Sequence, residues 1–379
     1  MKIGILTQPL YDNYGGLLQC YALQTILKNL GYDTWIVCRD IAIKRPTLIW
    51  SVYYYARQVV KVLLGKKFVK LLNPQKVDYA KRNTRYFTSE YINPKTELLT
   101  TSESLKGCHY KYGFDAYVVG SDQVWRPLYS PCITNYFLDF LSTDNKVKRV
   151  AYAASFGVDD WEFSEEETSV CRDLLKLFDG VSVREDSAID LCANYLGRED
   201  ALHVLDPTML LENEDYIRLV EKENEPKSEG NLFYYVLDKS EEKNQIIKTI
   251  AEEINAKPFT QMPQCPITYE NLKDRLEECV FPTVTAWLRA FMDADMIVTD
   301  SFHGCVFSII FNKPFWAIGN KGRGMARFNS LLSLYGLQDR LINNDCLPED
   351  INAPIDWSRV NAIKKEWQEK SLDFIKANL

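Results

Sequence analysis

Metal-ligating residues are scarce or scattered in this chain. It has three histidines among 379 residues, and its ten cysteines show neither a C-x-x-C pair nor regular spacing. This pattern does not match the closely spaced ligand pairs of zinc sites. Cys20, Cys38 and Cys305 stand in apolar runs, which is typical of buried, reduced thiols. The sequence therefore predicts neither a metal site nor a disulfide framework.

Long apolar runs are missing as well. The sequence has no stretch of about 20 uninterrupted apolar residues, so we expect no transmembrane helix. The N-terminal segment MKIGILTQPL does not have the layout of a signal peptide, because Gln8 and Pro9 interrupt its apolar run. We therefore expect a cytoplasmic protein, and contact with the inner face of the membrane is the alternative.

Positive charge is not in excess either. The 52 acidic residues outnumber the 45 basic ones, which gives a formal net charge of −7. Proteins that bind nucleic acids usually carry a basic face, so we expect no nucleic-acid partner. The glycines form neither a Walker loop nor a convincing G-x-G-x-x-G motif, so no nucleotide signature is present.

Met296–Thr299 predicts a strand, which a tight turn, the buried apolar helix Cys305–Phe311 and a second strand, Phe315–Ile318, follow. His303 falls where the first strand passes into the helix. The start of a helix carries unpaired N–H groups and a partial positive charge, so it attracts anions. An imidazole beside a bound anion can give or take a proton. The alternative is that His303 only caps the helix or fills the turn.

The N-terminal segment has the order of elements that opens a doubly wound α/β domain. The predicted elements are strand Ile3–Leu6, loop Tyr11–Gly16, helix Leu17–Leu30 and strand Thr34–Cys38. Ligands bind at the carboxyl ends of such strands, which places Asn13 and Tyr14 near a cleft. Alternatively, Asn13 and the glycines of this loop only shape the turn.

Two further strands end in polar residues. Strand Asp115–Val119 is followed by small and polar side chains that can hydrogen-bond a sugar, while an indole packs on the apolar face of its ring. These residues are Ser121, Asp122, Gln123 and Trp125. Arg184 follows strand Val181–Val183 and should face the same cleft. The alternative for Arg184 is an ordinary ion pair with Glu185, Asp186 or another nearby carboxylate.

The chain is long enough for two domains of ordinary size. Residues 221–230, EKENEPKSEG, are polar and rich in helix breakers, which is typical of a surface linker or loop. A second series of strands and helices begins at Leu232, and residues 356–379 predict a last amphipathic helix.

Residues 48–72 combine aromatic, aliphatic and basic side chains in one amphipathic segment. Such a segment could lie on an anionic membrane surface or cover an acceptor site. We favour a helical excursion that packs on its own domain, because basic amphipathic helices are common on soluble proteins.

Six stretches, in this order, resemble motifs of the polysaccharide pyruvyl transferase family. They are Asn13–Leu23 (NYGGLLQCYAL), Val119–Trp125 (VGSDQVW), Ser182–Ser187 (SVREDS), Leu205–Thr208 (LDPT), Thr299–Gly304 (TDSFHG) and Arg323–Leu332 (ending ARFNSLL). Each motif alone is weak, but their number and order make the resemblance strong. It spans roughly Met1 to Leu337.

The resemblance implies the α/β fold class, with two Rossmann-like, doubly wound domains facing a central cleft, as in glycosyltransferases of the B type. We place the N-terminal domain at residues 1–209 and the C-terminal domain, which carries TDSFHG, at residues 210–355. The final helix, 356–379, is expected to cross back to the first domain.

The resemblance also implies an activity. The family transfers a pyruvyl group from phosphoenolpyruvate to two hydroxyls of one sugar, forms a cyclic ketal and releases phosphate. The acceptor would belong to a polysaccharide or a lipid-linked oligosaccharide. No cofactor and no metal are expected, because phosphoenolpyruvate is itself the donor substrate.

The site residues follow from the same resemblance. His303 matches the family histidine and is the candidate general acid. The candidate phosphoenolpyruvate-binding residues are Arg184, Arg327, Ser301, Arg323 and Lys321. The candidates for the acceptor sugar or the cleft are Asn13, Tyr14, Gly15, Ser121, Asp122, Gln123 and Trp125. Some members carry an arginine at the position of Ser301, so this chain should supply that charge from elsewhere, with Arg184 and Arg327 as the best substitutes.

Two other classes of function remain open at this point. A nucleotide-sugar glycosyltransferase of the same architecture would require contacts to a ribose and a base, usually with an acidic residue in the second domain, for which Asp300 or Asp293 could serve. A non-catalytic sugar-binding protein would have no activity for His303 to support.

Overall fold

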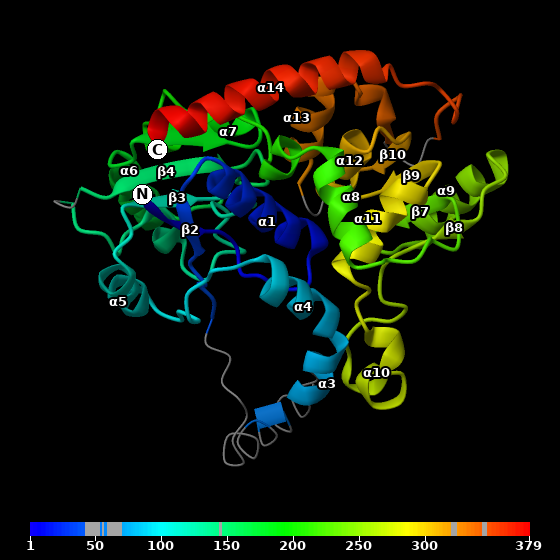
Figure 1. Ribbon diagram of the computed structural model, residues 1–379, viewed down its shortest axis with the longest axis horizontal. Coiled ribbons are helices and arrows are strands. Elements are labelled where there is room, and N and C mark those ends of the chain that lie inside the picture. The colour runs from blue at the N-terminus through cyan, green and yellow to red at the C-terminus, as the bar shows by residue number, and fades with distance from the viewer. Residues whose placement is uncertain (42–53, 55–56, 59–69, 144–145, 320–323, 343–346) are drawn as a thin grey trace.

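The structure is a computed structural model with two parallel β-sheets flanked by helices (Figure 1). It describes the chain apart from residues 42–53, 55–56, 59–69, 144–145, 320–323 and 343–346. Most of the basic aromatic segment 48–72 therefore lies outside the described residues, as do Lys321 and Arg323.

The first sheet has six parallel strands in the order β2-β1-β3-β4-β5-β6. The strands are β1 (Lys2–Leu6), β2 (Asp33–Ile36), β3 (Ala116–Val119), β4 (Lys148–Ala154), β5 (Gly180–Val183) and β6 (Leu202–His203). Every residue of β3 and β5 is buried, which explains why both strands are short apolar runs without alternation.

The second sheet has five parallel strands in the order β11-β10-β9-β7-β8. The strands are β7 (Leu232–Tyr235), β8 (Pro258–Phe259), β9 (Met296–Thr299), β10 (Phe315–Ile318) and β11 (Leu341–Ile342). Strands β9 and β10 have the bounds that the sequence predicts. The sequence did not predict β11, because two residues are too few to show a periodic pattern.

Helices connect the strands and cover the sheets (Figure 1). Those that begin before residue 210 are α1 (Tyr14–Asn29), α3 (Pro74–Ala80), α4 (Arg82–Tyr91), α5 (Ser102–Tyr112), α6 (Glu165–Leu175) and α7 (Ser187–Leu196). The later ones are α8 (Asn213–Lys222), α9 (Glu241–Glu253), α10 (Tyr269–Asp274), α11 (Val284–Asp293), α12 (Phe302–Ile310), α13 (Ala326–Tyr335) and α14 (Trp357–Asn378). Short 3-10 turns cover Ile133–Phe137, Pro207–Leu210, Glu277–Cys279 and Gln338–Arg340.

Helix α1 begins earlier than the sequence predicts. We expected a loop up to Gly16, but the helix starts at Tyr14. Asn13 caps it, because its side-chain oxygen accepts a hydrogen bond from the N–H of Gly16 at 3.3 Å. The glycine pair looked like a flexible loop because glycine has a low helix propensity. The cap places both glycines in the first helical turn.

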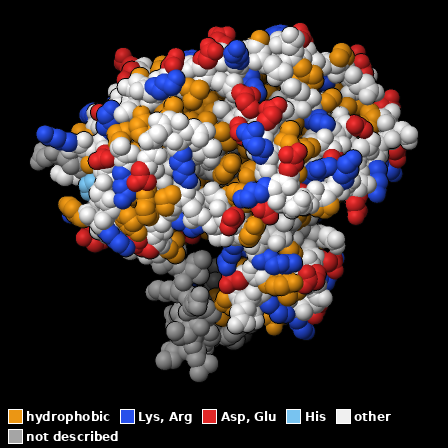
Figure 2. Space-filling view, viewed as in Figure 1, with side chains coloured by type: hydrophobic (Ala, Val, Ile, Leu, Met, Phe, Trp, Pro, Cys, Tyr) orange, Lys and Arg blue, Asp and Glu red, His pale blue; other side chains and the backbone are white. Residues whose placement is uncertain are grey.

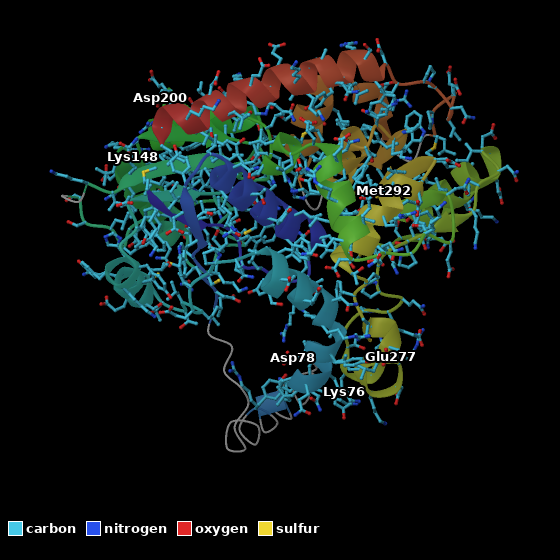
Figure 3. The ribbon with its side chains drawn as sticks, in the orientation of Figure 1. Lys76, Asp78, Lys148, Asp200, Glu277 and Met292 are labelled. Carbon is cyan, nitrogen blue, oxygen red and sulfur yellow. The ribbon has the colours of Figure 1, made fainter. Side chains whose placement is uncertain are left out.

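Helix α14 runs along both domains and ends at the first sheet (Figure 1). Ser371 accepts a hydrogen bond from the N–H of Leu205 at 3.0 Å. Near the C-terminal end of the helix, the ammonium group of Lys148 donates to the carbonyl of Leu379 at 3.2 Å (Figure 3). The last helix of the chain is thereby fastened to the first sheet.

A second contact joins the two halves of the chain at the opposite side of the molecule, where α3 lies beside α10 (Figure 1). Lys76 of α3 donates to the carbonyl of Leu272 of α10 at 2.8 Å. Lys70 and Glu270 form an ion pair at 3.2 Å. Figure 3 shows Lys76 on α3 and Glu277 on the 3-10 turn that follows α10. We call the contacts between residues 70–80 and residues 269–279 the α3–α10 bridge.

The surface carries both charge signs. On the face shown in Figure 2, basic and acidic side chains are interspersed and do not gather into one patch. Within the part of the chain that the structure describes, none of the helices is long and apolar enough to cross a membrane.

Candidate active site

The order of the strands decides where a ligand can bind. In the first sheet β1 lies between β2 and β3, and in the second sheet β7 lies between β8 and β9. The chain connections reverse direction at both places. Open α/β sheets bind ligands beyond the carboxyl ends of the strands at such reversal points.

Both reversal points open into one cleft of about 810 Å³. It is lined by residues that directly follow β1, β3, β7 and β9, together with the start of α1 and the start of α13. These include Gln8, Asn13, Gly16, Asp122, Gln123, Leu237, Asp238, Asp300, Ser301, Phe302, His303 and Arg327. Both halves of the chain therefore contribute to the same site.

His303 lies where two helix N-termini meet. It is the second residue of α12 and is almost fully buried. Its ring packs against Gly15 in the first turn of α1, so closely that a Cβ atom on Gly15 would overlap Nδ1 of the imidazole. The sequence placed Gly15 among the candidates for the acceptor sugar or the cleft. The structure instead shows that Gly15 provides the space in which the imidazole lies.

Asp206 holds the other side of the imidazole. Its Oδ2 atom lies 3.6 Å from Nε2 of His303. The same oxygen accepts a hydrogen bond from Arg184 at 2.9 Å, while Oδ1 accepts one from the hydroxyl of Thr208 at 2.7 Å. Burial by itself raises the pKa of Asp206, but His303, Arg184 and Thr208 together hold it well below its usual range. Asp206 is thus a buried, ionised carboxylate.

Arg184 lies beneath the cleft. We expected it to face the cleft or to form an ordinary surface ion pair with Glu185, Asp186 or another nearby carboxylate. In the structure it is buried and pairs with Asp206 at 2.9 Å and with Asp122 at 3.2 Å. Burial lowers its pKa, but these two carboxylates outweigh burial and raise it. Its charge is used to hold the two aspartates in place.

Arg184 and Arg327 are the two predicted donor-binding cations that the structure describes, and of these Arg327 lines the cleft. It is the second residue of α13, and its guanidinium carbon lies 5.9 Å from the centre of the Phe302 ring. The guanidinium of Arg184 lies over the same ring at 4.6 Å. Burial, together with repulsion from Arg184, lowers the pKa of Arg327 to about 10. A buried cation in this setting gains stability when an anion binds.

Ser301 also lines the cleft, at the N-cap position of α12. Within the described residues its side chain makes no capping hydrogen bond, although its N–H donates to the Thr299 hydroxyl at 3.1 Å. The first N–H groups of α12 therefore point toward the cleft without a side-chain cap, in the arrangement that suits an anion.

The loop after β3 brings Asp122 and Gln123 to the cleft. Asp122 has a φ angle of 70°, which aspartate tolerates better than most residues. Burial raises its pKa, but Arg184, His303 and Arg327 outweigh burial and lower it. Asn13 lines the cleft as well while it caps α1. Ser121 is instead buried behind the loop, where its hydroxyl donates to the Ala153 carbonyl at 3.0 Å.

Tyr14 and Trp125 lie in the core and not at the cleft. Tyr14 stacks on Trp287 with ring centres 5.7 Å apart, and its hydroxyl donates to the Pro282 carbonyl at 3.0 Å. Trp125 is completely buried, and its indole N–H donates to the Tyr136 carbonyl at 3.1 Å. The predicted stacking of Trp125 on a sugar is therefore wrong. An aromatic residue whose polar tip finds a backbone acceptor is stable in a core, and the sequence gave no sign of that acceptor.

The other two histidines, His203 and His109, contact the backbone or aromatic rings away from the cleft. Nε2 of His203 lies 3.0 Å from the carbonyl of Arg184, and its ring packs against Trp367 of α14. His109 of α5 packs against Tyr117. In the described part of the chain, no group of three or more histidine, cysteine or acidic residues could hold a metal ion.

Asp300 and Asp293, the two candidate acidic residues of a nucleotide-sugar transferase, both pair with other groups of this chain. Asp300 accepts hydrogen bonds from the N–H of Leu237 at 2.7 Å and from Lys243 at 2.6 Å. Asp293 pairs with Arg289 at 2.8 Å. These contacts fix the loop after β7 and the end of α11.

Sequence reasoning gave no role to Asp206 or Phe302. Asp206 stands in the LDPT motif, shortly after strand β6 and at the start of the 3-10 turn Pro207–Leu210, and an acidic residue near the end of a strand is a usable signal. Phe302 gave no such signal, because its place between two arginines depends on the tertiary fold.

The two facing sheets and their shared cleft define a glycosyltransferase-B-like architecture, as predicted. A solved structure of UDP-GlcNAc 2-epimerase from Neisseria meningitidis has a similar fold, with a TM-score of 0.51 and 8% identity over 98% of this chain and 94% of that one. UDP-GlcNAc 2-epimerase from Methanocaldococcus jannaschii gives a TM-score of 0.49 at 11% identity over 97% and 93% of the two chains. MurG from Acinetobacter baumannii gives 0.45 at 9% identity over 100% and 99%.

The family profile of polysaccharide pyruvyl transferases matches residues 13–322, which include Asp122, Asp206 and His303. The chain therefore belongs to the polysaccharide pyruvyl transferase family. A comparison with curated proteins finds no match.

Proposed function

We propose that this protein transfers a pyruvyl group from phosphoenolpyruvate to two hydroxyls of one sugar, forming a cyclic ketal and releasing phosphate. The acceptor sugar belongs to a polysaccharide or to a lipid-linked oligosaccharide. The observation that carries the proposal is the meeting of an imidazole, His303, with a buried cation, Arg327, in one cleft between the two sheets.

The donor has a phosphate and a carboxylate, so its site must offer several groups that favour negative charge. Arg327 and the N-terminus of α12 at Ser301 supply them from the second domain. Arg184 does not bind the donor directly in this proposal, because its charge is already paired with Asp122 and Asp206, which it holds in place. In this proposal, Arg327 and the N-terminus of α12 supply the positive charge that an arginine at position 301 supplies in some family members.

His303 is the proposed general acid. Its proton moves to the methylene carbon of phosphoenolpyruvate, which becomes a methyl group and leaves a cationic centre at C2 that the attached phosphate oxygen stabilises. The Asp206 carboxylate, 3.6 Å from Nε2, holds the ring in position.

The acceptor completes the reaction in two additions. One sugar hydroxyl attacks C2 and gives its proton to the imidazole of His303, which is neutral after the first proton transfer, and the C2–O bond to phosphate then breaks. The second hydroxyl attacks C2, gives its proton to the released phosphate and closes the ketal ring. Asp122 lies at the cleft and accepts hydrogen bonds from these hydroxyls in our proposal.

Calorimetric titration of the protein with phosphoenolpyruvate and, separately, with UDP-sugars tests this function. We expect heat of binding for phosphoenolpyruvate, followed by acceptor-dependent phosphate release. Binding of a UDP-sugar without binding of phosphoenolpyruvate would favour the nucleotide-sugar alternative. Binding of sugars alone, without phosphate release, would favour a non-catalytic protein.

A further inference from the structure

Four large apolar side chains are exposed around the rim of the cleft. Tyr11, Ile41, Leu128 and Tyr129 all line it, and their exposed fractions run from 42% for Tyr129 to 72% for Leu128. Exposed apolar groups are ordinary when they are scattered, but a group of them at the edge of a cleft marks a binding surface. All four come from the first domain, opposite the donor groups Ser301 and Arg327.

Contacts with neighbouring side chains hold the rings of Tyr11 and Tyr129 in place. The hydroxyl of Tyr11 donates a hydrogen bond to the carboxylate of Asp40. The ring of Tyr129 packs on the guanidinium of Arg126, whose carbon atom lies 4.7 Å from the ring centre. Arg126 is itself fixed by two hydrogen bonds of 2.9 Å to Glu162. Rings that are fixed before binding lose little conformational freedom when a ligand arrives.

The loops that carry the two tyrosines are fastened to each other. The side-chain amide of Gln8 donates to the carbonyl of Gln123 at 2.6 Å and to the hydroxyl of Ser130 at 3.2 Å. This joins the loop after β1, which carries Tyr11, to the loop after β3, which carries Tyr129. The two rings therefore belong to one preformed edge of the first domain.

We infer that Tyr11 and Tyr129 form a second sugar-binding subsite, which takes the sugar unit next to the one that receives the pyruvyl group. A tyrosine ring matches the apolar face of a pyranose, and its polar edge tolerates the surrounding hydroxyls and water. The inference rests on the proposed function, since it assumes that the reacting sugar lies deeper in the cleft.

Depth within the cleft supports this order. His303 and Arg327 are 5% and 7% exposed, whereas both rim tyrosines are more than 40% exposed. The cleft of about 810 Å³ lies near the upper end of the range of about 300–1,000 Å³ for pockets that hold drug-sized ligands. Phosphoenolpyruvate is smaller than one hexose, so the cleft has room for the donor and more than one sugar unit. The acceptor is therefore an oligosaccharide or a chain end, and a free monosaccharide fills only part of the site.

The test measures sugar binding without donor and without turnover. Saturation-transfer difference NMR is recorded with methyl glycosides of glucose, galactose, mannose and their N-acetylamino derivatives, and with disaccharides built from the same sugars. We expect at least one disaccharide to bind more tightly than the matching methyl glycoside. Tyr11→Ala and Tyr129→Ala should each reduce that disaccharide's affinity by roughly two- to tenfold and leave the methyl glycoside unaffected.

Tyr110→Ala is the matched control, because Tyr110 is a 74% exposed tyrosine on α5 that does not line the cleft. The inference is overturned if no disaccharide binds better than its methyl glycoside, or if both rim variants bind disaccharides like the wild type. It is also overturned if the rim variants lose binding only to vesicles that contain a polyprenyl phosphate, since the rim would then hold a lipid chain. Failure of phosphoenolpyruvate-dependent phosphate release, with rim-dependent disaccharide binding intact, would reject the proposed reaction and retain the subsite.

Discussion

The imidazole of His303 lies 3.6 Å from the carboxylate of Asp206, and this contact joins the two halves of the protein. Asp206 follows a strand of the first sheet, and His303 follows a strand of the second. Neither residue can hold its partner unless the two domains are packed in this arrangement. The position of the proposed acid therefore depends on the domain interface as well as on its own helix.

Replacing His303 by asparagine tests the acid directly. Asparagine keeps a polar side chain at the start of α12 but cannot deliver a proton at this position. We expect His303→Asn to fold normally, to retain phosphoenolpyruvate binding and to form ketal at least about a hundredfold more slowly. Thermal unfolding, calorimetry and phosphate release measure the three properties. His109→Asn, on α5, is the control, and near-wild-type turnover of His303→Asn would assign the residue a packing role.

Adding one methyl group at Gly15 should move the imidazole of His303 while leaving its chemical structure unchanged. A Cβ atom on Gly15 would overlap Nδ1 of His303, so we expect Gly15→Ala to lower turnover by about tenfold or more while phosphoenolpyruvate still binds. Gly107→Ala is the matched control, because Gly107 is also helical and a Cβ there would contact nothing within 4 Å. That variant should keep full turnover and gain about 0.5–1 kcal/mol of unfolding free energy. Equal turnover of the two variants would contradict the packing argument.

Arg327 should affect donor binding more than folding. Its pKa is lowered to about 10 by burial and by Arg184, which means that its charge costs the folded state free energy at neutral pH. We expect Arg327→Met to unfold at the same or a higher temperature than the wild type. Its phosphoenolpyruvate affinity should fall by roughly 10–100-fold, the usual effect of losing a hydrogen bond to a charged group. Arg218→Met, on the surface of α8, controls for the loss of a positive charge.

The same experiment can fail in an informative way. A marked loss of stability in Arg327→Met, with donor affinity unchanged, would show that this arginine supports the fold and does not hold phosphoenolpyruvate.

Arg184 should behave in the opposite way. Its removal leaves the carboxylates of Asp122 and Asp206 buried without their main counter-charge. We expect Arg184→Ala to lose about 3–5 kcal/mol of unfolding free energy, which is the usual cost of breaking a buried ion pair. Denaturant titration measures it. A variant with wild-type stability and weaker donor binding would return Arg184 to the donor site.

Acid should weaken the fold through Asp206. The pKa of its carboxyl is lower in the folded state than the ordinary value of about 3.9, so its contribution is fully present above that pH and is lost as the pH falls below it. Between about pH 4 and pH 2, Asp206→Asn should therefore lose stability less steeply than the wild type. Asp200→Asn, which removes an exposed carboxylate, should follow the wild-type curve. Parallel curves for Asp206→Asn and the wild type would contradict the assignment.

The sequence predicts the parts of this molecule that depend on local pattern. Strands β9 and β10 and the turn at His303 are bounded by an apolar run, a polar turn and Pro314, so they were found with their correct limits. The fold class followed from the motifs and the alternation of strands and helices. Helix α10 and strand β11 were missed because each is too short to show a period.

The site was predicted less completely, because its chemistry depends on distant partners. Arg184 and Arg327 look alike in sequence, and only the fold shows that one is paired with carboxylates while the other lines the cleft. Trp125 gave the pattern of a sugar-binding residue, but a backbone acceptor at Tyr136 holds it in the core. Such outcomes depend on contacts between residues that no local window contains.

The two domains are fastened along α14 and at the α3–α10 bridge, and dissolved salt acts on only part of these contacts. Helix α14 contributes buried contacts, such as the one between Ser371 and Leu205. The α3–α10 bridge includes exposed ion pairs, such as that of Lys70 with Glu270, which dissolved salt screens. It also buries Ala80 in one apolar cluster with Leu272 and Cys279. High ionic strength should therefore weaken the exposed ion pairs while the buried contacts keep the two domains packed around the cleft, so a bulky acceptor enters a cleft whose width salt hardly changes.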